Sequence, residues 1–525
     1  SSDAFVGKLD TAGGIAYLTY LGGSNVDVAY GIAVSGGSAY VAGYTLSTNF
    51  PVENGLANPP DSYNAFVTQF SAAGNTLVYS TRLGGNGSDA AFDIAVDGSG
   101  SAYVAGLTRS AGVNTGGVAT ISGNALKGTQ DGFIAKLATA IVPPGQGSRF
   151  FPVTPCRVVD TRENRPAPFG GPLLSAGVSR DFPVPNGGCG IPANATAYAV
   201  NATVVPQGTL GFLTLWPSGQ PMPIVSTLNA PDGVTVANNA IVPVGVNSSI
   251  SAIASHNTHL IIDITGYFAP STTQGFDFVP TTPCRVADSR EARPSPFGLP
   301  FLASGAQRNY PILMSECPTP TNAAAYAMNA TVVPRGFLGF VTLWPTGQAM
   351  PLASTQNGQD GNVIANGALV RAGTNQSVSA IASNDTDLIL DLNGYFPTTP
   401  GTGLEFHAVQ PCRIVDTREA RPLPYGAPFM NASTQRDFPV TAAGCAIPAA
   451  GAYSINVTVV PRGSLGFITV WPTGSPRPLA STLNASDGNI VANGAIVRAG
   501  TNSSISLFVS HNTDVIIDVN GYFAQ

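Results

Sequence analysis

The sequence predicts an all-β protein built from two kinds of internal repeat. Short runs rich in β-branched and aromatic residues recur along the chain, and Gly, Pro and Asn separate them at the spacing of strands in a sandwich or barrel. The 60 Gly and 43 Pro among 525 residues indicate many turns, but they remain below the share typical of unstructured low-complexity chains. No segment shows a sustained helical period or a helix start signal.

Charged residues are scarce. The chain has 23 Lys and Arg against 29 Asp and Glu, which is 10% of its residues, and its net charge is -6. A typical soluble domain carries about 25% charged residues, so Ser, Thr, Asn and Gln must solvate most of this surface. The sequence has no basic cluster for phosphate groups and no apolar stretch long enough to span a membrane. We therefore expect no nucleic-acid partner and no membrane span.

The part of the chain before residue 140 contains an internal repeat. The run Asp3-Ala-Phe-Val-Gly-Lys-Leu9 recurs as Asn64-Ala-Phe-Val-Thr-Gln-Phe70 and as Asp131-Gly-Phe-Ile-Ala-Lys-Leu137. Each copy offers four strand-like runs, which is the content of one propeller blade. The other recurring runs are Tyr20-Leu-Gly-Gly23 and Arg82-Leu-Gly-Gly85, Gly31-Ile-Ala-Val34 and Asp93-Ile-Ala-Val96, and Ala39-Tyr-Val-Ala-Gly43 and Ala102-Tyr-Val-Ala-Gly106.

These runs resemble, in content and order, the SBBP-type beta-propeller repeat of large secreted and surface proteins of bacteria. The resemblance implies a structural or binding role and assigns no catalytic residue. Two complete copies and one opening strand cannot close a ring, because propellers have about 4–8 blades. Either the chain is the C-terminal piece of a longer protein, or the strands form a small open assembly whose unpaired edge recruits another strand. We expect this region to make its missing β-contacts with a neighbouring copy.

A change in composition places the main boundary near residue 140. The three lysines are Lys8, Lys127 and Lys136, and every later basic residue except histidine is Arg. Residues 140–148 have the Pro, Gly and Ser content of a linker. The sequence therefore predicts a propeller-like domain over residues 1–140, followed by modules of a different kind.

Three homologous modules follow, at residues 149–270, 276–397 and 404–525. Their cysteines recur at a constant spacing, their tryptophans recur at almost the same spacing, and each module closes on Gly-Tyr-Phe. The short strand-like runs within each module predict a β-sandwich or Greek-key-like fold, repeated three times like beads on a rod. The modules also look like tandem modules of uncharacterised bacterial surface proteins, and no activity carries over from them.

Each module contains two cysteines, and their separation along the chain is the same in every copy. One pair per module at constant separation indicates a disulfide within each module and hence an oxidising compartment. Such a loop stabilises a module by about 3–4 kcal/mol in the chain-entropy model. Zinc is the alternative, but the cysteines lack a nearby His or a C-x-x-C spacing. The expected pairs are Cys156–Cys189, Cys284–Cys317 and Cys412–Cys445.

A charged cluster follows the first cysteine of each module, with the pattern Cys-Arg-x-x-Asp-Thr/Ser-Arg-Glu-x-Arg-Pro. A catalytic interpretation would pair its carboxylates as acid and base, as in glycoside hydrolysis. Arg neighbours lower carboxylate pKa values, however, whereas a general acid needs a raised pKa. We favour a structural ion-pair cluster that braces the disulfide loop. Its members are Asp160, Arg162, Glu163 and Arg165, then Asp288, Arg290, Glu291 and Arg293, then Asp416, Arg418, Glu419 and Arg421.

A second acidic residue recurs within an apolar strand of each module, as Asp263, Asp391 and Asp518. A carboxylate in so hydrophobic a run must be paired or must lie on the solvent face of its strand. We expect each to pair with an Arg of its own cluster. In module order, these partners are Arg162, Arg290 and Arg418.

The three tryptophans, Trp216, Trp344 and Trp471, each precede a proline. One Trp per secreted β-module suggests an aromatic platform for glycans, but we favour packing in the core, because Trp is highly buried on average. The four histidines occupy no position shared by all modules, and the sequence has no nucleophile elbow, zinc-protease motif or P-loop. We expect neither enzyme activity nor a cofactor or metal.

These observations favour a secreted or cell-surface structural protein that self-assembles through β-contacts into a filament, sheath or stalk. An adhesin or carbohydrate-binding protein is the alternative, and a hydrolase ranks third. The expected partners are copies of the chain itself, with glycans as a further possibility. The sequence starts Ser1-Ser2-Asp3 without an initiator Met, as expected of a mature or trimmed secreted product.

Overall fold

The computed structural model describes residues 2–10, 12–35, 38–52, 63–70, 74, 77–96, 102–110, 128–137, 147–270, 274–399 and 401–525. Every regular element in these ranges is a β-strand or a short 3-10 turn, so the all-β fold class is confirmed. The chain divides into two compact units, Ser1–Pro143 and Pro144–Gln525. This division falls within the stretch predicted to be a linker, most of which lies outside the described residues. The described ranges hold no helix of the length and hydropathy that crossing a membrane requires.

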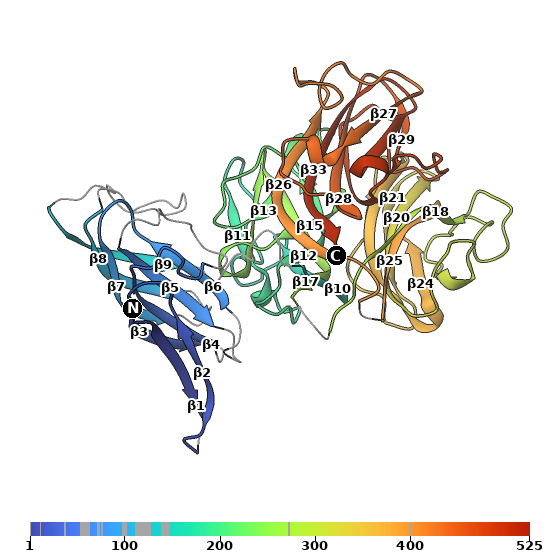
Figure 1. Ribbon diagram of the computed structural model, residues 1–525. Coiled ribbons are helices and arrows are strands. Elements are labelled where there is room, and N and C mark those ends of the chain that lie inside the picture. The colour runs from blue at the N-terminus through green and yellow to red at the C-terminus, as the bar shows by residue number, and fades with distance from the viewer. Residues whose placement is uncertain are drawn as a thin grey trace. The chain divides into compact units, whose positions relative to one another are not determined.

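The described residues of the N-terminal unit form three antiparallel sheets with two, four and three strands (Figure 1). Within each sheet, strands that are consecutive in the chain pair with each other. The strands are β1 (Ala4–Leu9) and β2 (Ile15–Leu21) in the first sheet, β3 (Asp27–Ser35), β4 (Ser38–Thr45), β5 (Asn64–Phe70) and β6 (Leu77–Leu83) in the second, and β7 (Asp89–Val96), β8 (Ala102–Thr108) and β9 (Asp131–Leu137) in the third.

The four strands of one sequence copy do not form one sheet, because the sheet boundaries are shifted by two strands relative to the repeat. A copy that opens on β1 ends on β4, whereas the complete sheet runs from β3 to β6. The cause is the Leu-Gly-Gly loop that follows β2 and β6. The Asp27 carboxylate accepts a hydrogen bond from the Gly23 amide, and Asp89 does the same for Gly85, so each loop is fixed as a connection between sheets.

The inner strands of the complete sheet, β4 and β5, are covered on both faces. Alternate residues of a strand point to opposite faces. Ala39 and Val41 of β4 share a buried cluster with Val6 of β1, whereas Tyr40 and Ala42 share another with residues of β7 and β8. The first and third sheets therefore pack on opposite sides of the second, and all seven residues of β5 are buried.

Each module of the second unit is a sandwich of two four-stranded antiparallel sheets. One sheet has the module's strands in the order first, eighth, third, sixth, and the other in the order second, seventh, fourth, fifth. This topology is the jelly roll, a double Greek key, which agrees with the predicted β-sandwich. Short 3-10 turns follow the second strand and the sixth strand of each module.

The strand bounds repeat closely between modules. They are β10 (Arg149–Asp160), β11 (Arg180–Pro183), β12 (Ala197–Pro206), β13 (Leu210–Pro217), β14 (Leu228–Ala230), β15 (Val236–Pro243), β16 (Ser249–Ala254) and β17 (Thr258–Ala269) in the first; β18 (Val279–Asp288), β19 (Arg308–Pro311), β20 (Ala323–Pro334), β21 (Leu338–Pro345), β22 (Gln356–Gly358), β23 (Ile364–Arg371), β24 (Ser377–Ala382) and β25 (Thr386–Pro397) in the second; and β26 (Glu405–Asp416), β27 (Thr434–Pro439), β28 (Ala452–Pro461), β29 (Leu465–Pro472), β30 (Leu483–Ala485), β31 (Val491–Arg498), β32 (Ser504–Val509) and β33 (Thr513–Ala524) in the third.

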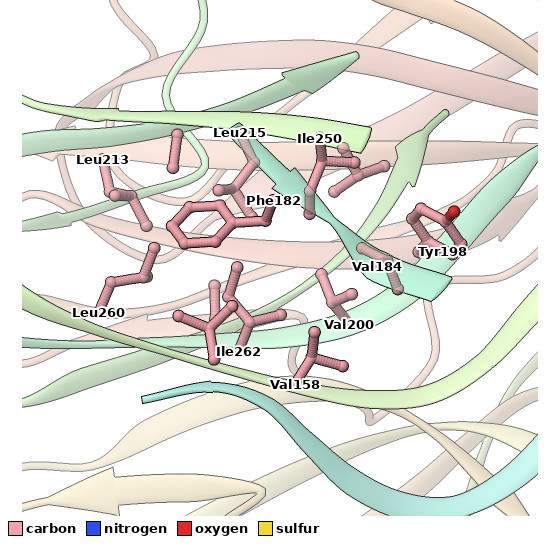
Figure 2. Close-up of a cluster of buried hydrophobic side chains, with 14 of the residues drawn as sticks. Val158, Phe182, Val184, Tyr198, Val200, Leu213, Leu215, Ile250, Leu260 and Ile262 are labelled. Atoms are coloured by element: carbon pink, nitrogen blue, oxygen red, sulfur yellow. The ribbon is translucent and has the colours of Figure 1, made fainter. Parts of the chain in front are cut away.

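Each module has its own apolar core between its two sheets. In the first module, alternate residues of β12 and β17 face alternate residues of β11, β13 and β16, as period-2 patterning requires. Figure 2 shows this core, with Phe182, Leu215 and Ile250 from one sheet and Val200, Leu260 and Ile262 from the other.

The three modules also share a fourth core, so the predicted beads on a rod are wrong. Six phenylalanines meet there, and ring centroids from different modules lie 4.5 Å apart for Phe150 and Phe396 and 4.4 Å apart for Phe268 and Phe406. Phe278 and Phe523 complete the set at 4.6 Å. The physical reason is that the first sheet of each module is apolar on its outer face as well, and that face must be covered.

Asparagine side chains close the three modules into a ring. Asn201 of the first module donates to the carbonyl oxygen of Ser354 in the second, at 2.7 Å. The equivalent bonds run from Asn329 to Ser481, from the second module to the third, and from Asn456 to Ser226, from the third back to the first. The second unit is thus a pseudo-threefold trimer of jelly rolls within one polypeptide.

Candidate functional site

The predicted charged clusters are present, with their aspartates buried and one change of partner in each. Asp160 accepts two hydrogen bonds from the Arg162 side chain, at 2.9 and 2.7 Å, and one from Arg157 at 3.2 Å. Asp263 pairs with Arg157, not with Arg162 as expected. The same pairing holds for Arg285 with Asp391 and for Arg413 with Asp518, so the expected partners Arg290 and Arg418 are also wrong.

The register of two neighbouring strands explains this change. Arg157 lies directly opposite Asp263 in the antiparallel pair of β10 and β17, so its side chain emerges beside the carboxylate. Arg162 lies beyond the end of β10, where it folds back onto Asp160 two residues earlier. The remaining members, Glu163 with Arg165, Glu291 with Arg293 and Glu419 with Arg421, form more exposed ion pairs.

Burial and charge push the two carboxyl groups of each cluster in opposite directions. Burial opposes ionisation of Asp160, but the hydrogen bonds and charge of Arg162 outweigh it and hold the pKa of Asp160 below its usual value. Burial raises the pKa of Asp263, and Arg157 offsets only part of that rise. Asp391 and Asp518 follow Asp263, and burial raises the pKa of each to about 6. A pair of carboxyl groups with separated pKa values suits acid–base chemistry, but both groups are buried from solvent here.

Two of the clusters also reach the neighbouring module. The Arg157 guanidinium donates to the carbonyl oxygen of Leu352 at 3.1 Å, and Arg285 donates to that of Leu479 at 3.2 Å. The clusters therefore tie the disulfide loops to the module interfaces. The disulfides themselves join Cys156 to Cys189, Cys284 to Cys317 and Cys412 to Cys445.

The tryptophans do not form a glycan platform. Trp216, Trp344 and Trp471 are at most 5% exposed, and each indole N–H donates to a backbone carbonyl four residues later. The large ring gains more from burial beside the following turn than from exposure to solvent. The tryptophans are therefore not available as an aromatic platform. They are buried, as the packing interpretation expected, but beside a turn and outside the core clusters of the modules.

One carboxylate cluster was not foreseen from the sequence. Asp232, Asp360 and Asp487 come from equivalent turns of the three modules, and their oxygens lie within 4.8 Å of one another. Desolvation, followed by the charges of Asp360 and Asp487, raises the pKa of Asp232. Three oxygen ligands of this kind can hold a hard cation such as Ca²⁺. Their regular spacing was visible in the sequence, but only the closed ring brings them together.

One exposed apolar surface in the described part of the N-terminal unit is a face of the first sheet. Phe5 lies opposite Tyr20, and Leu9 lies opposite Ile15, with Leu18 between them on β2. These five side chains are 56–78% exposed. We call this surface the β1–β2 face. Single exposed apolar residues are ordinary, but a contiguous set marks a site of interaction.

A second face of the same unit is exposed on the third sheet. Ile134 of β9 is 83% exposed and lies beside Ala105 of β8, where Tyr103 and Lys136 form the neighbouring pair. The Lys136 ammonium lies 4.9 Å from the centre of the Tyr103 ring. We call this surface the β8–β9 face. Sequence reasoning expected a free sheet edge in this region, but it did not identify either face.

Comparison with known proteins bears on the N-terminal unit. The beta-propeller repeat family SBBP matches residues 78–112, a stretch that includes β7 and β8. This match supports the resemblance seen in the sequence. No curated protein matches the chain.

Two solved structures show weak likeness. A glycoside hydrolase family 43 arabinoxylan arabinofuranohydrolase from Bacillus subtilis, in complex with cellotetraose, shares 12% identity over 50% of this chain and 55% of its own, with a TM-score of 0.12. A structure of Sulfolobus Turreted Icosahedral Virus shares 10% identity over 71% of this chain and 91% of its own, with a TM-score of 0.11. The chain thus spans little more than half of the hydrolase. TM-scores this low support no inference about the fold or function of this chain.

Proposed function

We propose that this protein is an extracellular structural protein that associates with copies of itself through its N-terminal unit, as the subunit of a filament, sheath or stalk. Three disulfides fit folding in an oxidising compartment. The trimeric C-terminal unit supplies a body whose modules are joined by a shared core and by buried hydrogen bonds. The N-terminal unit supplies the contact between subunits.

The β1–β2 face carries this proposal. It presents Phe5, Leu9, Ile15, Leu18 and Tyr20 to solvent, without a charged side chain among them. Burying a large apolar side chain contributes about 1.5–3 kcal/mol, so covering five of them offsets much of the entropy that is lost on association. The low charge of the chain also weakens the repulsion between copies.

Two observations favour this proposal over the alternatives. An adhesin with a Trp platform has no exposed Trp to offer. A glycoside hydrolase would need a reachable pair of carboxyl groups, whereas Asp160 and Asp263 are fully buried beneath arginines. We therefore keep the proposal of a structural protein without enzyme activity.

The test is the concentration dependence of association. Multi-angle light scattering and negative-stain microscopy of the whole chain should show species that grow with protein concentration and extend as filaments. Leu18→Arg places a charge at the centre of the β1–β2 face and should abolish this growth. Ile224→Arg is the control, because Ile224 is an 85% exposed residue of the other unit. A wild-type chain that stays monomeric at high micromolar concentration would refute the proposal.

A further inference from the structure

The three sheets of the N-terminal unit share a two-sided strand motif. It occurs as Ala4-Phe5-Val6 in β1, Ala65-Phe66-Val67 in β5 and Gly132-Phe133-Ile134 in β9. Because side chains alternate along a strand, the phenylalanine points to one face of its sheet and its aliphatic neighbour points to the other. Each sheet thus has an aromatic side and an aliphatic side at equivalent positions.

Two junctions within the chain join an aliphatic side to an aromatic side. Val6 of the first sheet shares a buried cluster with Phe66 of the second, and they are 3% and 0% exposed. Val67 of the second sheet, also 0% exposed, packs in the cluster that Phe133 of the third sheet contacts. The same contact is therefore made twice in the same direction along the chain.

One half of this junction is left exposed at each end of the unit. Phe5 is 68% exposed on the β1–β2 face, and Ile134 is 83% exposed on the β8–β9 face. Their internal counterparts show what covers such residues, because Phe66 is covered by a valine side and Val67 by a phenylalanine side. The two exposed faces are thus the complementary halves of an interface that the chain already contains.

We propose that the β8–β9 face of one copy covers the β1–β2 face of the next, with Ile134 against Phe5. This inference rests on the proposed self-association and names the surfaces that make it. Small residues favour this fit. Ala105 lies opposite Ile134, and a side-chain carbon added at Gly132 would have no heavy atom nearer than 3.8 Å, which leaves room for an aromatic ring.

The contact is heterologous, because two different surfaces meet. A symmetric contact would place the β1–β2 face against the same face of the partner, and it would repeat neither internal junction. Head-to-tail contacts leave one free face of each kind on every dimer, so growth continues until the chain of subunits closes or ends.

Mixing two blocked variants tests the direction of the contact. Tyr20→Arg blocks the β1–β2 face, and Ile134→Arg blocks the β8–β9 face. Both side chains are largely exposed, at 78% and 83%, so neither substitution should disturb folding, and circular dichroism and thermal melting check this. Each variant alone should be monomeric. An equimolar mixture should form dimers and nothing larger, because the one intact face of each kind lies on different partners.

The outcomes separate this inference from the proposed function. If the wild type assembles but the mixture stays monomeric, or if either variant alone still assembles, the head-to-tail interface is wrong while self-association stands. If the Ile134→Arg variant alone forms a dimer, the contact is between two β1–β2 faces. If the wild type itself is monomeric, both proposals fail.

Discussion

At the scale of single residues, the arginines that follow the first cysteine of each module organise the charged clusters. Arg157 contacts Asp160, Asp263 and the backbone of the neighbouring module, so one guanidinium links two strands and two modules. The planar fork of Arg allows this, because its donors point in several fixed directions. Removing a carboxylate from such a cluster leaves a largely buried cation without its closest partner.

Asp263→Ala should therefore destabilise the second unit by about 3–5 kcal/mol, the loss expected on breaking a buried pair. The free energy of unfolding in urea measures the effect. Glu163→Ala is the matched control, because its pair with Arg165 is half-exposed and such pairs contribute about 1 kcal/mol or less. A loss below about 1 kcal/mol for Asp263→Ala would mean that Arg157 is satisfied by its other contacts.

Asp391 gives the stability a pH dependence. Its Oδ2 accepts no hydrogen bond from the described residues, and burial raises its pKa to about 6. A carboxyl group with a raised pKa binds its proton more tightly in the folded chain. The stability it contributes is complete below its unfolded pKa of about 4 and is lost as the pH rises through about 6.

Lowering the pH from 7 to 5 should thus increase the free energy of unfolding, by about 1–2 kcal/mol for this group. Asp391→Asn should remove this part of the increase. Below about pH 4 the trend should reverse, because Asp160, Asp288 and Asp416 have lowered pKa values and lose their ion pairs on protonation. Unfolding midpoints of the wild type and of Asp391→Asn across this pH range check both the rise and the fall in stability. If the two proteins depend on pH in the same way, Asp391 is not the source of the increase.

At the scale of elements, the sixth strands of the three jelly rolls approach each other closely around the pseudo-threefold axis. A side-chain carbon at Gly494 of β31 would collide with the carbonyl oxygen of Asn239 in β15, and one at Gly367 of β23 would collide with that of Gly494. Asn238, Asn366 and Asn493 bind across the same axis. Glycine at these positions is therefore a requirement of the interface and not of a turn.

Gly494→Ala should destabilise the second unit by about 1–3 kcal/mol, as expected of an overpacked core. Gly358→Ala is the matched control. Its added carbon would meet its neighbours at an ordinary 3.5 Å, and the other modules carry Ala230 and Ala485 at this position. The control should be neutral or more stable by about 0.4–1 kcal/mol. Equal effects of the two substitutions on the thermal midpoint would show that the axis relaxes freely.

The elements themselves were largely predictable from the sequence, and their packing was not. Period-2 runs such as Ser249–Ala254 predict strands, and constant spacing predicts the cysteine pairs. The partner of Asp263 depends on the register of β10 against β17, which two bulges shift and which no local pattern encodes. The shared core had a weak signal in Ala197–Val204, which is apolar or small on both faces.

At the scale of the whole molecule, the two units differ in how their cores are built. The modules of the second unit are joined by a common aromatic core and by asparagine bonds that close a ring. The sheets of the first unit stack in a row and leave a face exposed at each end. One unit is thus complete by itself, whereas the other has complementary surfaces to offer.

Scanning calorimetry should therefore show the second unit melting in one cooperative transition, separate from that of the first unit. The calorimetric enthalpy of this transition should be close to its van't Hoff enthalpy, since the three modules unfold together. Independent modules would give a ratio near three, and Gly494→Ala would then affect one module alone. In the Gly494→Ala variant, the midpoint of this single transition should be lower than in the wild type. The midpoint of the first unit should stay unchanged.

The closed ring of modules also has a consequence for how the protein withstands dilution. A trimer of separate chains dissociates as its concentration falls, whereas three modules on one chain meet at a high effective concentration fixed by their short linkers. Dilution therefore cannot take this trimer apart. Because the three modules lie on one chain, their sequences need not be identical. Asn239, for example, occupies the position that Gly367 and Gly494 occupy in the other modules, and the surface of each module can change independently.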